Sequence, residues 1–387
     1  MREKDAQPGI DGRRVRDVAL MFLKIGLTSF GGPAAHTGLM HREIVQRRGW
    51  LTDGEFLDLL GAANLIPGPN STEMAIHIGY RRAGWPGLVA AGVCFIVPAM
   101  LITMGFGWLY VRYGTLPQAA WLLYGVKPVV MAIIGFALWN LRRAAAKTPS
   151  MAAGVAVSCV LSLCGVNELA VLFGCGAVVA VARIAGQRIR GASCAIMPLA
   201  AAGISAAGAA PFSSSTLFLT FLKIGAVLYG SGYVLLAFLR GDFVERLGWL
   251  TDQQLIDAVA AGQITPGPLF STAAFVGYVL GGPQAALLAT AGIFLPSFVF
   301  VALSGPLVAR MRSSPLAGAL LDGVNAASIG LMLAVAVQLG RASFVDPVTV
   351  CAGILCLLLL VRYTLNSAWL IAGGAAAGYA VHWCRGM

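Results

Sequence analysis

Charge is scarce in this chain. Asp, Glu, Lys and Arg make up 11% of its 387 residues, whereas an average soluble domain has about 25%. The segments 87–110 and 316–339 contain almost none of them, and 58% of all residues are hydrophobic. A soluble globular fold is therefore excluded, and apolar runs of this length predict helices that cross a bilayer. The alternating pattern of an outer-membrane barrel is missing too, so we predict an all-α polytopic membrane protein.

Catalytic and nucleotide-binding motifs are also missing. The sequence has no G-x-x-x-x-G-K-[ST] loop, so ATP does not drive this chain. It has no H-E-x-x-H or G-x-S-x-G motif, and its four histidines do not cluster like a metal site. None of the eight cysteines forms a C-x-x-C pair and most lie in apolar runs, which favours packing roles. We therefore expect no enzyme, no cofactor and no metal.

Acidic residues are fewer than basic ones, which leaves a net charge of +11. We do not expect a nucleic-acid partner, because the basic residues lie in short loops between apolar segments, as the positive-inside rule predicts. Residues 1–16 are polar and basic and lack an apolar h-region, so we expect no cleavable signal peptide. The expected surroundings of the chain are a lipid bilayer.

One short motif interrupts the apolar segment 56–80. Pro67 and Pro69 remove backbone donors and Gly68 between them is free to turn, so a continuous helix is excluded. The motif returns 199 residues later as Pro266, Gly267 and Pro268. Matching helix breaks in the two halves of a hydrophobic chain point to the binding site of a transporter.

Other motifs recur at the same offset. FLKIG at 22–26 returns at 221–225, and GWLTD at 49–53 returns at 248–252. Such matches over roughly 75 residues indicate a duplication of about 190 residues. The predicted units are a basic tail at 1–17, a first transporter repeat at 18–191, a connecting segment at 192–215 that crosses as a helix, and a second repeat at 216–387.

The arginines predict that the second repeat is inverted. Arg81-Arg82 correspond to Gly281-Gly282, whereas the loop that holds Arg112 alone corresponds to the loop with Arg310 and Arg312. The charge bias has changed sides, as it does when one repeat is upside down. Inverted halves need an odd number of membrane crossings between equivalent points. Each half has six predicted segments, so the weakly hydrophobic connector 194–211 must add one more crossing.

Together these motifs resemble the chromate ion transporter family in its long, two-domain form. The matching motifs are FGGP at 30–33, GWLTD at 49–53, PGP at 67–69 and the partners of the last two at 248–252 and 266–268. The resemblance implies a secondary active exporter in the bacterial inner membrane, an antiporter driven by the proton motive force. It also implies chromate resistance, with sulfate as the competing oxyanion. FGGP becomes YGSG at 229–232, so the halves are not equivalent.

The polar residues beside the breaks are the predicted substrate site. A helix that restarts there points free N–H groups and its positive dipole end into the cavity, which suits a tetrahedral dianion. Lys24 and Lys223 match each other within apolar segments, where charge is costly, although they could snorkel to the interface. The predicted substrate-binding residues are Lys24, Lys223, Asn70, Ser71, Thr72, Ser271 and Thr272.

Proton coupling is predicted for Glu73 and His77, which lie one turn apart on one helix face. The second half has no acid or imidazole in the matching stretch 272–276. An ionised Glu73 would compete with the anion and yield when protonated, which would link proton entry to anion exit. The alternatives are that Asn70 and Glu73 form a capping box, and that His77 lies near the interface.

Further polar residues match between the halves. Lys127 and Asn325 are candidates for the transport pathway; the alternative is an interhelical hydrogen bond or a kink at Pro128. Asp58 and Asp257 are expected at the water interface.

The connector after the first break is charged. It holds Arg42, Glu43, Arg47 and Arg48, and we expect a solvated face at the headgroups. The alternative is an entry funnel for anions.

Two other function classes stay open. A channel would need a pathway but no alternation, and an intramembrane enzyme would need motifs that the sequence lacks. Chromate and sulfate are not distinguished, because both are tetrahedral dianions of similar size. The oligomeric state is not fixed either, and a homodimer stays open.

Overall fold

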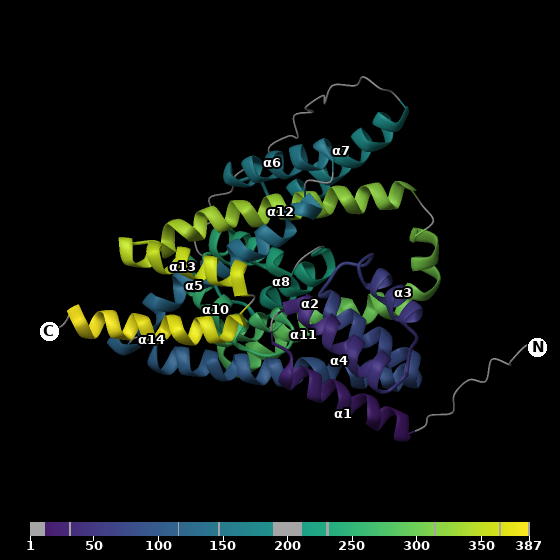
Figure 1. The fold of residues 1–387 in the computed structure, drawn as a ribbon, viewed down its shortest axis with the longest axis horizontal. Coiled ribbons are helices and arrows are strands. Elements are labelled where there is room, and N and C mark those ends of the chain that lie inside the picture. The colour runs from purple at the N-terminus through teal and green to yellow at the C-terminus, as the bar shows by residue number, and fades with distance from the viewer. Residues whose placement is uncertain are drawn as a thin grey trace, which may run out of the picture.

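The structure is a computed structural model. It describes residues 12–30, 32–114, 116–145, 148–188, 211–229, 232–312, 315–363 and 365–385. The tail at 1–11 and residues 192–210 of the predicted crossing segment lie outside the described residues. Four helices in the described part are long and apolar enough to cross a membrane, within 70–113, 118–141, 269–303 and 318–343. The predicted all-helical membrane fold is confirmed (Figure 1).

The first predicted segment is a helical hairpin. Helix α1 (Gly12–Thr28) ends at the first break, and α2 (Gly32–His41) with the π-helix η1 (Arg42–Arg47) returns beside it. Lys24 and Glu43 lie 3.2 Å apart across this hairpin. The chain therefore turns back at the break and does not continue across the molecule.

The second broken segment turns back in the same way. Helix α3 (Asp53–Ala63) starts with a capping box between Thr52 and Glu55, and α4 (Asn70–Tyr113) begins after the Pro-Gly-Pro motif. Glu55 at the start of α3 binds Arg81, eleven residues into α4, at 3.3 Å. The start of α3 thus lies beside Arg81, at the far end of the first part of α4. This end of the molecule is called the first face below.

Helix α4 is itself two helices. Ala83 (φ −141°, ψ 21°) and Gly84 (φ 62°, ψ −150°) are non-helical, and the chain reverses there. Gly79 contacts the carbonyl oxygen of Gly87 so closely that a side chain on either residue would collide with the other backbone. Small residues allow two helices in lipid to approach this closely. Residues 70–82 therefore belong to the re-entrant hairpin, and 85–113 form the crossing helix.

The second half repeats this plan. Its elements are α8 (Ser214–Val227), η2 (Gly232–Val234), α9 (Leu235–Leu239), η3 (Arg240–Arg246), α10 (Asp252–Ile264), η4 (Leu269–Ser271) and α11 (Thr272–Arg312). Helix α11 reverses at Gly281 and Gly282, as α4 does at Ala83 and Gly84. The expected match of Gly281-Gly282 with Arg81-Arg82 is therefore wrong, and the uncharged residues Val279 and Leu280 correspond to the two arginines. An added Cβ at Gly277 would lie 2.5 Å from the carbonyl oxygen of Ala285. The duplication predicted from the sequence is thus visible element by element.

The contacts between α4 and α11 fix the relative direction of the halves. Moving along α4 away from the first face, Thr103 donates to the carbonyl of Ser271 at 3.1 Å. Further on, an added Cβ at Gly107 would lie 2.8 Å from Cβ of Tyr278. The helix 272–280 therefore runs from the middle of the molecule to the face opposite the first one. The second half enters from that second face, so the halves are inverted.

The remaining helices are exchanged between the halves. Helix α5 (Pro117–Ala145) packs against α13 (Pro347–Tyr363) and α14 (Ser367–Arg385), and α12 (Pro315–Ser343) packs against α6 (Pro149–Leu163) and α7 (Glu168–Arg188). Gly125 meets Gly374, and Gly323 meets Gly176, backbone against backbone. Each half therefore completes the other. Figure 1 shows α3 toward the right edge of the molecule and α14 reaching its left edge, with α10 between them.

The inversion gives a labelling prediction. Arg81 and Gln284 are exposed residues beside the two chain reversals. In a cysteine-free background, Arg81→Cys and Gln284→Cys should react with a membrane-impermeant maleimide from opposite sides of the membrane. Permeabilised cells provide the control for total reactivity. Labelling of both positions from one side would contradict the inverted arrangement.

Candidate functional site

The two Pro-Gly-Pro tips meet the opposite half of the chain. The amide N–H of Gly68 donates to the carbonyl of Leu228 at 2.8 Å, and that of Gly267 donates to the carbonyl of Ser29 at 2.8 Å. Leu228 is the repeat equivalent of Ser29, and Gly267 that of Gly68, at the same offset of 199 residues. The tips are therefore related by a two-fold axis, and each one binds the end of the first helix of the other half.

Both tip glycines occupy positions closed to other residues. Gly68 has φ +132° and Gly267 has φ +95°, where side chains are strongly disfavoured. An added Cβ on Gly68 would collide with Glu73 and lie 2.8 Å from Ser297 Oγ. On Gly267 it would lie 3.0 Å from Cβ of Ala99. The two motifs are thus packed against the crossing helices α11 and α4.

The helices restart differently after the two tips. Helix α4 begins at Asn70 with Pro69 as its N-cap, and no side chain caps it. The alternative of a capping box between Asn70 and Glu73 is therefore wrong: Pro69 is the N-cap, and the side-chain amide of Asn70 donates to Asn64 Oδ1 at 2.6 Å. In the second half the 3₁₀ turn η4 comes first, and Thr272 donates to the carbonyl of Leu269 at 2.7 Å. The first free N–H groups of both helices lie at the meeting of the halves.

Several polar side-chain atoms around the tips are buried without a hydrogen-bond partner. Among the described residues they include Ser29 Oγ, Thr72 Oγ1, Glu73 Oε2 and Ser271 Oγ. Buried polar atoms in proteins are nearly always paired with protein, water or ligand. Hydroxyls beside two helix N-termini can donate to an anion. The arrangement is therefore chemically suited to bind an oxyanion.

Glu73 is the buried acid at this meeting point. It is fully buried, and Ser297 of α11 donates to its Oε1 at 3.5 Å. His77 follows one turn later on α4 and is 8% exposed, with Nε2 unpartnered. The second half has Thr272 in place of Glu73. An ionisable acid thus stands beside one of the two tips.

Lys24 and Lys223 are held by acids of their own halves. Lys24 lies 3.2 Å from Glu43, and Lys223 lies 2.5 Å from Asp242. Glu43 also binds Arg47 at 2.9 Å, and Asp242 binds Arg246 at 2.9 Å. All three members recur at the offset of 199 residues, so the structure contains two equivalent Lys–acid–Arg triads. In both, the lysine charge is balanced by a buried carboxylate.

The triads correct the expectation for the charged connector. Glu43 is 4% exposed, so it does not belong to a solvated face. Burial raises the pKa of Glu43, but the hydrogen bond from Lys24 and the charges of Lys24, Arg47 and Arg48 outweigh it and hold the pKa below its ordinary value. Sequence reasoning missed the pairing of Lys24 with Glu43, although the shared spacing of 19 residues in both halves was a usable signal.

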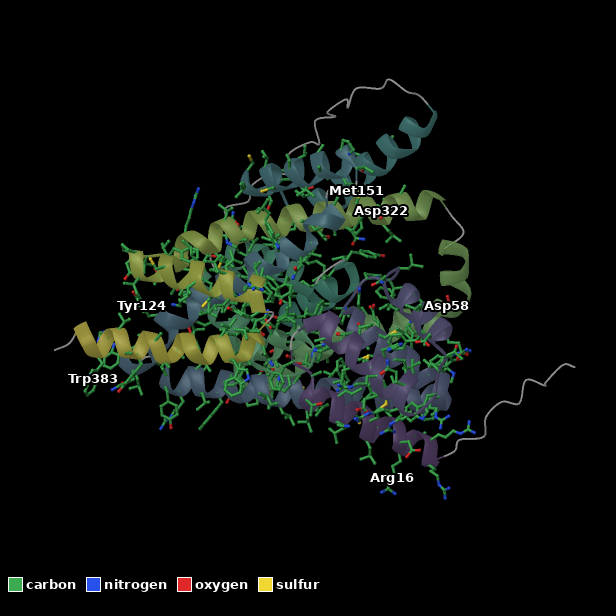
Figure 2. The ribbon with its side chains drawn as sticks, viewed as in Figure 1. Arg16, Asp58, Tyr124, Met151, Asp322 and Trp383 are labelled. Carbon is green, nitrogen blue, oxygen red and sulfur yellow. The ribbon has the colours of Figure 1, made fainter. Side chains whose placement is uncertain are left out.

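A second polar contact joins the halves toward the second face. Tyr110 of α4 donates to Asp257 of α10 at 3.0 Å, and the charge of Lys127 acts on the same carboxylate. Asp257 is 5% exposed, so its expected place at the water interface is wrong. Asp58 is exposed, as expected, and lies at the edge of the molecule in Figure 2. Lys127 and Asn325 are both half-buried on the matching helices α5 and α12.

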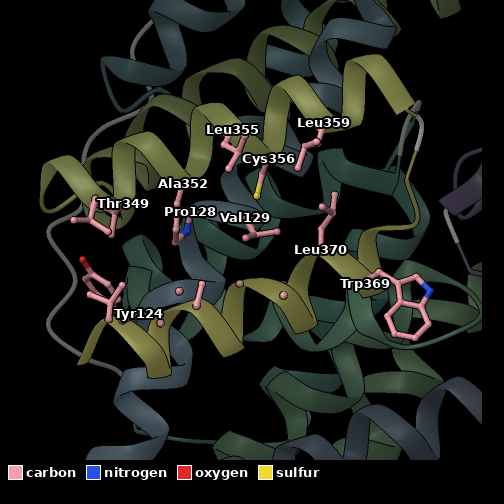
Figure 3. A pocket seen from close by; sticks show the side chains of 17 residues that line it. Tyr124, Pro128, Val129, Thr349, Ala352, Leu355, Cys356, Leu359, Trp369 and Leu370 are labelled. Carbon is pink, nitrogen blue, oxygen red and sulfur yellow. The ribbon is translucent and has the colours of Figure 1, made fainter. Parts of the chain in front are cut away.

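A cavity of about 260 Å³ lies between α5, α13 and α14. Its lining is almost wholly apolar, with Val129, Leu355 and Trp369 among the residues shown in Figure 3. Tyr124 at its rim binds Asp346 at 2.5 Å. In the described part of the chain no Lys or Arg lines these walls, and the hydroxyls of Tyr124 and Thr349 already donate to Asp346. A dianion would lack a positive partner there, so this cavity is not the site for an oxyanion.

Comparisons with known proteins agree with this duplicated architecture. The sequence model of the family described as "Chromate transporter" matches residues 16–181 and 215–379. A "Chromate transport protein" of Cupriavidus metallidurans is 33% identical over 94% of this chain and 92% of its own length. A "Chromate transport protein" of Pseudomonas aeruginosa is 32% identical over 83% of this chain and 80% of its own. No solved structure matches.

The triads generate a stability prediction. Lys24→Gln leaves the buried Glu43 carboxylate with one partner fewer, which should cost about 1–3 kcal/mol of stability. Lys24→Gln combined with Glu43→Gln removes the charge together with its partner and should recover most of this loss. Thermal unfolding in detergent measures both variants, and Lys223→Gln with Asp242→Asn is the matched pair. A double variant as unstable as the single one would contradict the pairing.

Proposed function

The chain belongs to the chromate transporter family, and on this premise we propose that it exports chromate across the bacterial inner membrane, driven by the proton motive force. The observation that carries the proposal is the meeting of two re-entrant hairpins from opposite faces, at Gly68 and Gly267. In transporters with inverted repeats, a central site between the repeats opens to each face in turn. Rocking of one half against the other would open it.

The oxyanion binds between the two tips in this proposal. The helix starts after Pro69 and Pro268 each offer about half a positive charge. Asn70, Ser71 and Thr72 line the site from the first half, and Ser271 and Thr272 from the second. Thr72 Oγ1 and Ser271 Oγ, buried without partners, are the donors expected to reach the anion. Sulfate has the same shape and charge and is the expected competitor.

Lys24 and Lys223 have a conditional place in this site. Each is paired with a carboxylate, so neither offers a net positive charge while its triad is closed. We assign them to the moving parts: a triad that opens as one half rocks would release its lysine toward the anion. Lys127 and Asn325 are assigned to the pathway on the basis of their matching, half-buried places on α5 and α12.

Glu73, with His77 one turn away, is the proposed coupling group. An ionised Glu73 repels a dianion at the first tip, so the anion binds best when Glu73 is protonated. Carrying a dianion outward with one proton still moves one net negative charge. A membrane potential favours that movement by about 2.3 kcal/mol per charge per 100 mV. If the dianion binds only while Glu73 is protonated, one proton leaves with each anion and the membrane potential is the driving force. The alternative is that the outgoing anion is exchanged for an inward proton.

Glu73→Gln tests this role. Chromate uptake into everted vesicles should fall in the wild type as the pH rises and Glu73 ionises, because the anion is then repelled. The glutamine variant imitates the protonated acid, so its uptake should stay high and lose this pH dependence. Glu245→Gln, at a half-exposed acid, is the matched control. An unchanged pH profile in Glu73→Gln would contradict the coupling role.

The same vesicles decide the direction of proton movement and the function class. A lumen that acidifies during chromate uptake indicates that proton and anion travel together, and one that becomes alkaline indicates antiport. A channel for the same anion is the alternative function. Under an imposed potential it would accumulate chromate without any coupled change in pH, in wild type and Glu73→Gln alike.

A further inference from the structure

A basic crevice lies at the first face, away from the tips. It has a volume of about 160 Å³ and is lined by Arg14, Trp50, Leu51, Glu55, Ile78, Arg81 and Arg82. These residues come from the start of α1, the stretch before α3, α3 itself and the end of the re-entrant part of α4. A volume of this size holds several water molecules, each of which occupies about 30 Å³ in the liquid.

The guanidinium groups in and beside this crevice are arranged around one aromatic ring. Arg82 and Arg48 stack on Trp50 at 4.9 and 5.0 Å from the ring centre. Arg82 Nε is buried without a hydrogen-bond partner. Stacking fixes a planar guanidinium and leaves its N–H edge available, which suits bidentate recognition of an oxyanion.

The lining of the crevice is more basic than acidic. Arg14, Arg81 and Arg82 contribute three positive charges, and Glu55 contributes one negative charge. Both Glu55 oxygens are engaged, Oε1 by Arg81 at 3.3 Å and Oε2 by the Thr52 N–H at 2.9 Å. Basic side chains therefore outnumber acidic ones in the lining, and Arg82 Nε has no hydrogen-bond partner. Helix caps and ion pairs alone do not require this excess.

The second half fills the same place with an apolar side chain. Trp249 is the repeat equivalent of Trp50, and the apolar residues Val279 and Leu280 stand where Arg81 and Arg82 do, because Gly281-Gly282 correspond to the chain reversal at Ala83-Gly84. Phe212 packs on Trp249 at 5.2 Å between ring centres. An added Cβ on Gly281 would lie 2.6 Å from the ring of Phe212. If the arginines only stabilised the fold, apolar packing like that of Phe212 on Trp249 would do so equally well. The basic version is specific to the first half.

We propose that this arginine crevice is a binding site for a tetrahedral oxyanion at the first face. Two sources supply that chemistry: the free transported anion, captured before it reaches the tips, and the phosphate of an anionic lipid headgroup. The first source rests on the proposed transport function, whereas the second does not. Binding in the crevice is separate from binding at the tips, because the two sites share no residue.

The test uses the purified full chain in neutral detergent with radiolabelled sulfate in equilibrium dialysis. Arg81→Gln combined with Arg82→Gln should bind one sulfate fewer per chain than the wild type. Arg14→Gln, a milder change at the rim, should weaken that sulfate by about tenfold. Arg16→Gln is the matched control, because this exposed arginine of the same helix points away from the fold in Figure 2.

A second measurement identifies a lipid source. Native mass spectrometry with phosphatidylglycerol, and with phosphatidylcholine as the control lipid, counts the retained lipids. If the headgroup fills the crevice, the double variant loses one phosphatidylglycerol while its sulfate count stays unchanged. If neither count differs between the wild type and the arginine variants, the proposal is overturned. The difference of one bound ligand between the wild type and the double variant does not depend on binding at the tips. The crevice proposal can therefore hold even if the transport proposal fails.

Discussion

Two backbone hydrogen bonds between the halves, from Gly68 to Leu228 and from Gly267 to Ser29, are the contacts on which the rest of the arrangement depends. Proline on each side of the glycine ends the helix, and the exposed amide must find an acceptor inside a bilayer, where water is absent. The acceptor is the broken first helix of the opposite half. Each half thus satisfies the backbone of the other, and two helix N-termini reach the middle of the molecule together.

Two-fold symmetry positions these elements, and departures from it supply the chemistry. Glu73 contacts Ser297 on one side of the axis, whereas the equivalent positions hold Thr272 and Ala99. At the first face the arginine crevice corresponds to a space that Phe212 fills in the second half. Duplication therefore provides a scaffold with two equivalent tips, and differences between the repeats give that scaffold a buried acid beside one tip and a basic crevice at one face.

The sequence predicted the helix breaks and the inverted duplication well, because Pro-Gly-Pro has one local consequence wherever it lies. It left open whether the broken segments cross or re-enter, since that depends on Glu55 meeting Arg81 across a turn. The sequence also did not predict the exchange of α6–α7 and α13–α14 between the halves. That exchange depends on backbone contacts between residues far apart in the chain, such as Gly125 and Gly374. Lys24 was predicted to face the anion, but its pairing with the buried Glu43 required tertiary structure.

The central claim is that the transported oxyanion binds between the two tips. The most direct measurement is the anomalous scattering of chromium in crystals of the full chain grown with chromate. The account predicts a peak within hydrogen-bonding distance of the hydroxyls of Thr72 and Ser271, and loss of that peak in Thr72→Val with Ser271→Ala. Strong chromium peaks elsewhere, with none between Gly68 and Gly267, would contradict it.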